Sequence, residues 1–258
     1  MRQSSSSART EVVIVASAFG VDAIRRDGHA AWAEKASLSG ADGFEVRREL
    51  CEDASLDALT RLGERIRAAG LWAVHSTPAA LFSADGSLDH EALALAIDEA
   101  RALDARIVKL QLGGDERGVA TDSATLEALT RATDGSPARV LVENGQLRAG
   151  GLPNAFEMLF AALPAESNLA MTFDTGNWRW ADVDPLDAAR RLGQHVGYIH
   201  CKATQGEGAR RFAVAPDHDD TQFAALLAHL PSDAPRGIEF PFRDEADAAT
   251  QVARIAAF

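Results

Sequence analysis

The sequence predicts a single (β/α)8 barrel, a closed ring of parallel strands surrounded by helices. Its 258 residues match the roughly 250 that such a barrel typically needs. From Glu11 onward, short runs of β-type residues alternate with longer segments of helical period, the pattern of a parallel sheet built from strand and helix units. Two smaller domains would also fit the length, but no linker rich in Pro, Gly or Ser marks a boundary. We therefore expect one domain over residues 11–258, preceded by a disordered, Ser-rich tail over residues 1–10.

Eight segments have the length and composition of strands. Eight is the number at which a parallel sheet closes into a barrel without exposed edges. In chain order, the predicted strands are Val12 to Ala18, Gly43 to Arg47, Leu71 to Ser76, Arg106 to Gln111, Arg139 to Glu143, Leu169 to Asp174, Val196 to Lys202 and Gly237 to Phe240.

The intervening segments carry helix signals. Ser55 offers an N-cap before leucines that recur every three or four residues, and Gly70 supplies the left-handed residue that ends the helix. Asp184 followed by proline predicts another helix start. We expect the apolar stripes to pack on the outside of the barrel. Two long segments that follow strands, Leu112 to Thr121 and Ala203 to Asp219, are expected to form loops at its catalytic face.

Composition excludes several classes of function. The net charge of −12 argues against a broad nucleic-acid surface, so no nucleic-acid partner is expected. Cys51 and Cys201 are the only cysteines, which fits a reducing cytoplasm and excludes a disulfide framework. The N-terminus lacks the apolar segment of a secretory signal, and no stretch approaches about 18 uninterrupted apolar residues. We expect a cytoplasmic protein that does not span a membrane.

Four of the predicted strands end in, or run directly into, a side chain of a metal-binding type. They are Glu143, Asp174, His200 and Glu239, at intervals of 31, 26 and 39 residues, close to the length of one strand and helix unit. These side chains should therefore meet at one mouth of the barrel, where three acids would repel one another without a cation. Three oxygens and one nitrogen suit Mn²⁺, Mg²⁺ or Co²⁺, with Zn²⁺ as a further candidate.

Polar pairs two residues apart should also point into the barrel, since strand side chains alternate between two faces. Isolated charges there are costly unless they are partnered or bind a ligand. Internal ion pairs or a solvated rim are the alternative interpretation. The pairs are Glu45 with Arg47, Lys109 with Gln111, and His200 with Lys202.

Three motifs carry a resemblance to a known family: Val142-Glu143-Asn144, Phe173-Asp174-Thr175-Gly176-Asn177 and His200-Cys201-Lys202. In this order and spacing the chain resembles the xylose isomerase-like TIM barrels, which include sugar isomerases and epimerases and a branch of apurinic endonucleases. The resemblance covers essentially the whole chain. It implies that Glu143, Asp174, His200 and Glu239 bind the metal, and that Glu143 and Glu239 also move protons.

The chain also resembles, more narrowly, an epimerase associated with 2-ketogluconate utilisation. Four segments carry this resemblance: Phe44 to Leu50, Val142 to Asn144, His200 to Ala203 and Glu239 to Pro241. Two residues depart from the broader epimerase pattern. Asn177 stands where several members carry histidine, and Ala203 stands where many carry aspartate. These departures put in doubt any transfer of substrate from better-known members.

The predicted function is a metal-dependent isomerase or epimerase acting on a keto sugar or sugar acid. The metal would polarise the carbonyl and stabilise an enediolate, while Glu143 and Glu239 transfer the proton. Lys202 would steady an oxyanion or a substrate carboxylate, or else pair with a ligand carboxylate. Arg210 and Arg211 would meet an acidic substrate or form a solvated basic pair. The candidate substrate-binding residues are Glu45, His75, Lys109, Gln111, Asn177 and Lys202.

Three other functions remain open on the same barrel. A dehydratase or lyase would use the same metal site, because proton removal beside a carbonyl can be followed by loss of a hydroxyl group. An endonuclease acting at abasic sites would need many more histidines than His75 and His200. A sugar-binding subunit without catalysis would need no proton transfer. Family members often form dimers or tetramers, so a homo-oligomer is one expectation.

Overall fold

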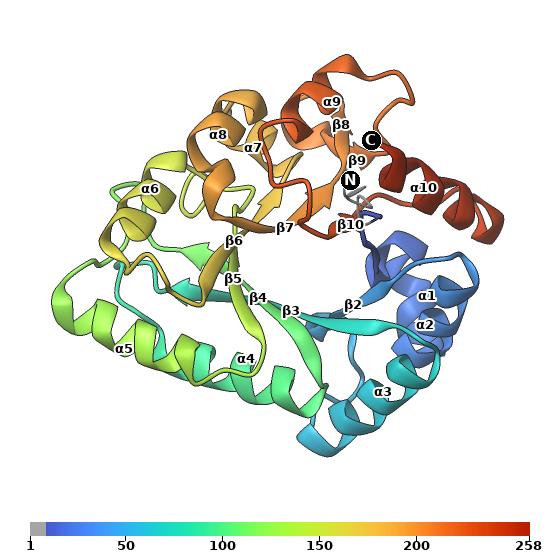
Figure 1. Ribbon diagram of the computed structural model, residues 1–258, viewed down its shortest axis with the longest axis horizontal. Helices are drawn as coiled ribbons and strands as arrows, with labels where there is room; N and C mark the ends of the chain where they lie inside the picture. The colour runs from blue at the N-terminus through green and yellow to red at the C-terminus, as the bar shows by residue number, and fades with distance from the viewer. Residues whose placement is uncertain (1–8) are drawn as a thin grey trace, which may run out of the picture.

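The computed structural model describes residues 9–258, which form a closed parallel barrel (Figure 1). The predicted (β/α)8 barrel is confirmed, whereas most of the predicted tail over residues 1–10 lies outside the described residues. The strands run β1-β10-β7-β6-β5-β4-β3-β2 around the ring. They are β1 (Val12–Val15), β2 (Gly43–Arg47), β3 (Trp72–Phe82), β4 (Ala105–Gly113), β5 (Arg139–Glu143), β6 (Leu169–Asp174), β7 (Val196–Cys201) and β10 (Arg236–Ile238).

Helices surround the strands (Figure 1). The predicted N-cap is present, since the Ser55 hydroxyl accepts the Ala58 N–H at 3.3 Å, and Gly70 has a φ of 81°. No helix in the described part of the chain is long and apolar enough to cross a membrane. The helices are α1 (Val21–Asp27), α2 (His29–Leu38), α3 (Leu56–Ala68), α4 (His90–Ala102), α5 (Ser123–Asp134), α6 (Pro153–Ala162), α7 (Asn177–Trp180), α8 (Pro185–Leu192), α9 (Thr221–Leu227) and α10 (Glu245–Ala257).

The largest differences from the predicted elements lie in three places. β1 ends at Val15 and continues as a short 3-10 helix. β3 extends to Phe82, because a register shift after Ser76 lets it go on pairing with β4. The segment expected to be a loop from Ala203 to Asp219 contains a small antiparallel sheet of β8 (Ala203–Gln205) and β9 (Phe212–Val214).

The barrel interior is apolar at one end and polar at the other. Alternation places the apolar layer inside the ring and the polar layer nearer the carboxyl ends of the strands, as Leu141 and Glu143 illustrate on β5. The candidate site therefore lies at the carboxyl mouth, where loops rather than helices cover the barrel. The inner apolar layer consists of Val13, Val74, Ile107, Leu141, Ala170 and Tyr198.

Candidate metal centre

The structure brings the four predicted ligands together at the carboxyl mouth. Glu143 ends β5, Asp174 ends β6, His200 lies near the end of β7, and Glu239 directly follows β10. One ligand atom from each lies within 4.8 Å of the other three, so this group could hold a metal ion. The convergence follows from topology, since parallel neighbouring strands end at the same edge of a barrel.

His200 lies at the middle of the group. Its Nδ1 is 2.8 Å from Glu143 Oε1, 3.2 Å from Glu239 Oε2 and 3.8 Å from Asp174 Oδ2. Its other ring nitrogen, Nε2, is 2.8 Å from the carboxylate of Glu45. Although burial opposes it, Glu45, Glu239 and Glu143 raise the pKa of His200 well above its usual value, so the metal-free ring carries a proton on both nitrogens. A metal ion would replace the proton on Nδ1, while the carboxylate at Nε2 favours keeping the other proton there.

Two carboxylate oxygens at the centre fit a divalent cation. Glu143 Oε1 and Asp174 Oδ2 are buried and accept no hydrogen bond of good geometry within the described structure. Nitrogen atoms do approach them, His200 Nδ1 at 2.8 Å and Lys202 Nζ at 2.7 Å, but out of line. Buried carboxylate oxygens without a hydrogen bond are costly, and a hard cation with mainly oxygen ligands would satisfy them.

Each glutamate of the centre is anchored through the oxygen that lies away from His200 Nδ1, although Glu239 Oε2 also accepts a hydrogen bond from Lys202 Nζ at 2.7 Å. Glu143 Oε2 accepts hydrogen bonds from Lys109 Nζ at 2.7 Å and Gln111 Nε2 at 2.5 Å. Glu239 Oε1 accepts from Arg47 Nη1 at 2.8 Å. The opposite oxygen of each glutamate faces His200 Nδ1. Anchoring through one oxygen thus orients the other toward the centre.

Neighbouring cations keep the two glutamates ionised. Burial alone would raise the pKa of Glu143, but Lys109 and His200 hold it well below the usual value. Burial likewise opposes ionisation of Glu239, whose pKa Lys202 and His200 hold well below the usual value. Asp174 differs, because burial raises its pKa despite the nearby Lys202. Both glutamates are therefore ionised at neutral pH.

The predicted substrate-binding residues Glu45, Lys109, Gln111 and Lys202 also lie at the mouth. Each of them contacts at least one other side chain of the site. Besides its bond to His200, Glu45 accepts a hydrogen bond from Tyr198 at 3.0 Å, and Lys109 Nζ lies 3.6 Å from Glu45 Oε1. Lys202 contacts Asp174 and Glu239, the second of the two predicted alternatives. Internal ion pairs thus coexist with the candidate centre.

Asn177 lies behind the centre rather than in its opening. Its backbone N–H donates to Asp174 Oδ1 at 2.8 Å. Its side-chain amide donates to the carbonyl of Asn144 at 2.8 Å and accepts from Gln146 at 3.3 Å. These contacts brace the Asp174 loop, so contact with substrate by Asn177 stays a prediction.

The expected placement of His75 is wrong. Val74 faces the barrel interior, so His75, the next residue, faces the helices instead. Its Nε2 lies 3.0 Å from Glu99 of α4, and Glu99 also binds Arg48 at 2.7 Å. The ring is buried away from the mouth and does not belong to the candidate centre.

Two residues of the site were missing from the predicted set of ligands and substrate contacts. Arg47 orients Glu239, and Tyr198 donates its hydroxyl hydrogen bond to Glu45. Strand alternation contains the signal for both, because Arg47 is two residues from Glu45 and Tyr198 is two residues from His200.

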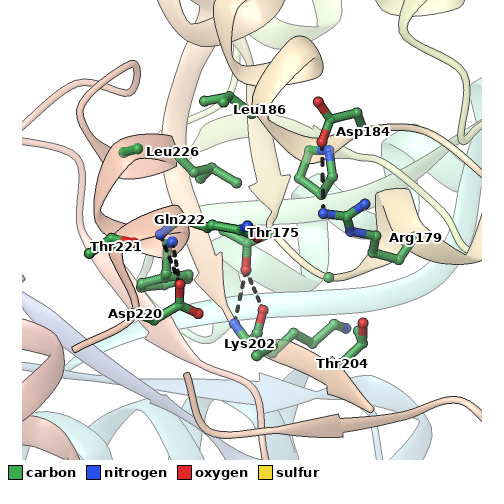
Figure 2. A pocket seen from close by; sticks show the side chains of 15 residues that line it. Thr175, Arg179, Asp184, Leu186, Lys202, Thr204, Asp220, Thr221, Gln222 and Leu226 are labelled. Carbon is green, nitrogen blue, oxygen red and sulfur yellow. Dashed lines mark hydrogen bonds and ion pairs between the residues drawn. The ribbon is translucent and has the colours of Figure 1, made fainter. Parts of the chain in front are cut away.

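A cavity of about 490 Å³ lies beside the centre, between α8 and α9 (Figure 2). Thr175 and Lys202 line it on the side of the barrel, and Arg179 and Asp184 form an ion pair of 3.7 Å at its edge. Of the two arginines expected either to meet an acidic substrate or to form a solvated basic pair, Arg210 is exposed. Arg211 contacts the ring of Trp180 and the carbonyl of Arg179.

A buried histidine outside the centre, His29, binds the backbone of Arg47. We expect its titration to make the stability of the protein depend on pH. His29 Nε2 accepts the backbone N–H of Arg47 at 3.2 Å, and burial lowers the pKa of His29 from 6.5 to about 4. The unfolded chain therefore binds more protons between these values. The contribution of neutral His29 to the free energy of unfolding is complete above about pH 6.5 and is lost as the pH falls toward 4. The loss is about 3 kcal/mol in the free energy of unfolding.

Urea unfolding at pH 7 and pH 4 measures this difference. Between pH 7 and pH 4, the free energy of unfolding of the wild type should fall by about 3 kcal/mol more than that of His29→Gln, whose amide does not titrate. The exposed His90→Gln is the matched control and should lose as much as the wild type. Equal losses in the wild type and His29→Gln would contradict the prediction.

Comparisons with known proteins show which solved structures share the fold. No family model matches the chain, and no curated protein matches it. Among solved structures, a xylose isomerase domain containing protein from Salmonella typhimurium LT2 is 17% identical, with a TM-score of 0.67 over 97% of each chain. D-allulose 3-epimerase from Methylomonas sp., in complex with D-allulose, is 15% identical, with a TM-score of 0.67 over 97% of each chain.

A third similar structure is described as the probable 3-DHS dehydratase involved in petrobactin synthesis from Bacillus anthracis. It is 11% identical, with a TM-score of 0.65 over 95% of this chain and 98% of that chain. At such identities the likeness shows the fold alone. The chain thus has the fold of the xylose isomerase-like TIM barrels.

Proposed function

We propose that this protein is a divalent-metal-dependent isomerase or epimerase that acts on a keto sugar or a related sugar acid. The observation that carries the proposal is the convergence of Glu143, Asp174, His200 and Glu239 within 4.8 Å at the barrel mouth. Fold likeness to a D-allulose 3-epimerase supports the same class of substrate. Mn²⁺, Mg²⁺ and Co²⁺ are the metals best suited to this ligand set, with Zn²⁺ as a further candidate.

The metal, when bound, would polarise a substrate carbonyl and make the neighbouring C–H bond more acidic. One of Glu143 and Glu239 then accepts the proton from that carbon, and the electron pair shifts into the carbonyl to give an enediolate. The other glutamate, after it has taken up a proton from solvent, donates that proton to the enediolate, and the first glutamate releases its proton to solvent. Return to the same carbon on its opposite side gives epimerisation, and return to the neighbouring carbon gives isomerisation.

The anchoring contacts support a role in proton transfer. A carboxylate that is to accept a proton from the substrate needs one oxygen fixed in direction toward the reacting carbon. Lys109 and Gln111 fix Glu143 in this way. Arg47 fixes Glu239 through Oε1, while Oε2 faces the centre and Lys202.

Metal analysis and solvent exchange test the proposal together. Protein reconstituted with Mn²⁺ should retain the ion, and in D₂O it should incorporate deuterium beside the carbonyl of its keto sugar or sugar acid substrate. The substrate should not lose water. Loss of water would identify the dehydratase alternative, to which the Bacillus anthracis structure is similar in fold. Ligand binding without exchange would identify a sugar-binding subunit.

The nuclease alternative has little support from the site. Among the described residues, His200 is the one histidine in the candidate metal group, and His75 points away from it. A trinuclear zinc centre needs several histidines. Self-association, cytoplasmic location and the narrower resemblance to the 2-ketogluconate-associated epimerase stay predictions.

A further inference from the structure

The ammonium of Lys202 occupies the edge of the candidate centre. Its Nζ lies 2.7 Å from Asp174 Oδ2 and 2.7 Å from Glu239 Oε2. These are the same two oxygens that face His200 Nδ1. A divalent cation at the centre would therefore compete with the ammonium for two of its three carboxylates.

The Lys202 side chain is held firmly in this position. Its backbone N–H donates to Thr175 Oγ1 at 3.0 Å, and Thr175 Oγ1 donates to the Lys202 carbonyl at 2.7 Å. The aliphatic stem runs past Gly176, where an added Cβ would lie only 2.7 Å from Lys202 Cγ. The side chain is 5% exposed. Glycine at position 176 thus leaves room for the Lys202 side chain to reach Asp174 and Glu239.

The arginine and the other lysine of the mouth contact different oxygens. Arg47 binds Glu239 through Oε1, and Lys109 binds Glu143 through Oε2. Neither of these oxygens faces His200 Nδ1. Arg47 and Lys109 can therefore keep their contacts when a metal binds, whereas Lys202 shares its two oxygens with the metal.

We propose that Lys202 is an internal counter-ion. Its ammonium neutralises Asp174 and Glu239 in the metal-free protein, and it gives up these contacts when the divalent cation binds. The inference rests on the proposed metal site. Three buried carboxylates without a cation repel one another, and the ammonium reduces this repulsion. The same ammonium lowers the affinity for the metal, because both cations use the same oxygens and repel each other. Lys202 thus makes metal binding weaker and more readily reversible.

Calorimetric titration of the metal-free full chain with Mn²⁺ tests the inference without requiring a substrate. Lys202→Met keeps most of the stem volume and removes the charge, so it should bind Mn²⁺ at least about tenfold more tightly than the wild type. Lys202→Arg keeps a cation and should stay within about threefold of the wild type. The metal-free Lys202→Met protein should also melt at a lower temperature, and Mn²⁺ should restore its stability.

Arg47→Met is the matched control. It removes a cation from the same Glu239, but from the oxygen that faces away from His200, so any tightening should be smaller than in Lys202→Met. Lys202→Gln, which keeps a polar side chain, serves in place of Lys202→Met if that variant does not fold.

The outcomes distinguish a failure of the counter-ion proposal from a failure of the proposed function. Unchanged or weaker Mn²⁺ binding in both neutral Lys202 variants overturns the counter-ion and leaves metal-dependent function intact. Binding by Lys202→Met but not by the wild type supports the counter-ion and weakens the proposed function. Absence of binding in every protein overturns both.

Discussion

Glu239→Gln is expected to lower the rate of solvent deuterium exchange by about 10³-fold in the Mn²⁺-loaded protein. The amide cannot accept the proton that the Glu239 carboxylate would take or return. It also replaces an ionised ligand, whose pKa Lys202 and His200 hold well below the usual value in spite of burial, by a neutral one. Proton NMR of the substrate in D₂O, under saturating Mn²⁺, measures exchange after metal binding has been restored.

Glu49→Gln is the control for this experiment. Glu49 accepts a hydrogen bond from Arg47 at 2.9 Å, and Arg47 also binds Glu239, so Glu49 belongs to the same network without contacting the centre. It has no place among the four candidate ligands. Its exchange rate should stay within a few-fold of the wild type. Full exchange in metal-loaded Glu239→Gln would remove Glu239 from the mechanism.

Glu45→Gln is expected to weaken Mn²⁺ binding by about 10-fold to 100-fold without touching a ligand position. Glu45 is fully buried and fixes the His200 ring by accepting from Nε2 at 2.8 Å. Burial opposes its ionisation, yet His200 and Lys109 lower its pKa to about 2, so it is charged at neutral pH. The neutral amide makes the imidazole a weaker ligand and no longer dictates which nitrogen carries the proton.

Calorimetric titration with Mn²⁺ measures this loss, and Tyr198→Phe provides the comparison. That variant removes only the hydroxyl that donates to Glu45 at 3.0 Å, so its Mn²⁺ affinity should fall much less. If Glu45→Gln and the wild type have the same affinity, the carboxylate does not support the His200 ligand. The two proteins should then be compared by ring ¹⁵N shifts of His200, which report the tautomer directly.

Periodicity and spacing were sufficient for the fold and for the four residues at the strand ends. Glu143, Asp174 and His200 each fall at the end of an apolar run, and the runs are separated by one strand and helix unit. Since consecutive parallel strands are neighbours in a barrel, local pattern was enough to predict that these side chains meet.

The sequence was insufficient where a choice between two faces of a strand depended on register. His75 lies in an apolar run whose neighbours do not show which face is inside, and β3 places it against Glu99 of α4. The register shift after Ser76 could not be read from composition either, because it depends on pairing with β4.

The sequence by itself determined the barrel and the identities of the side chains at its mouth, because both follow from local periodicity and from the chain order of the strands. Only the tertiary structure decided which oxygen each cation occupies. Arg47 and Lys109 bind the outward oxygens of Glu239 and Glu143, whereas Lys202 shares its oxygens with the candidate metal centre. Such a choice depends on distances of a few ångströms between residues far apart in the chain, and these are fixed only when the barrel closes and its side chains pack.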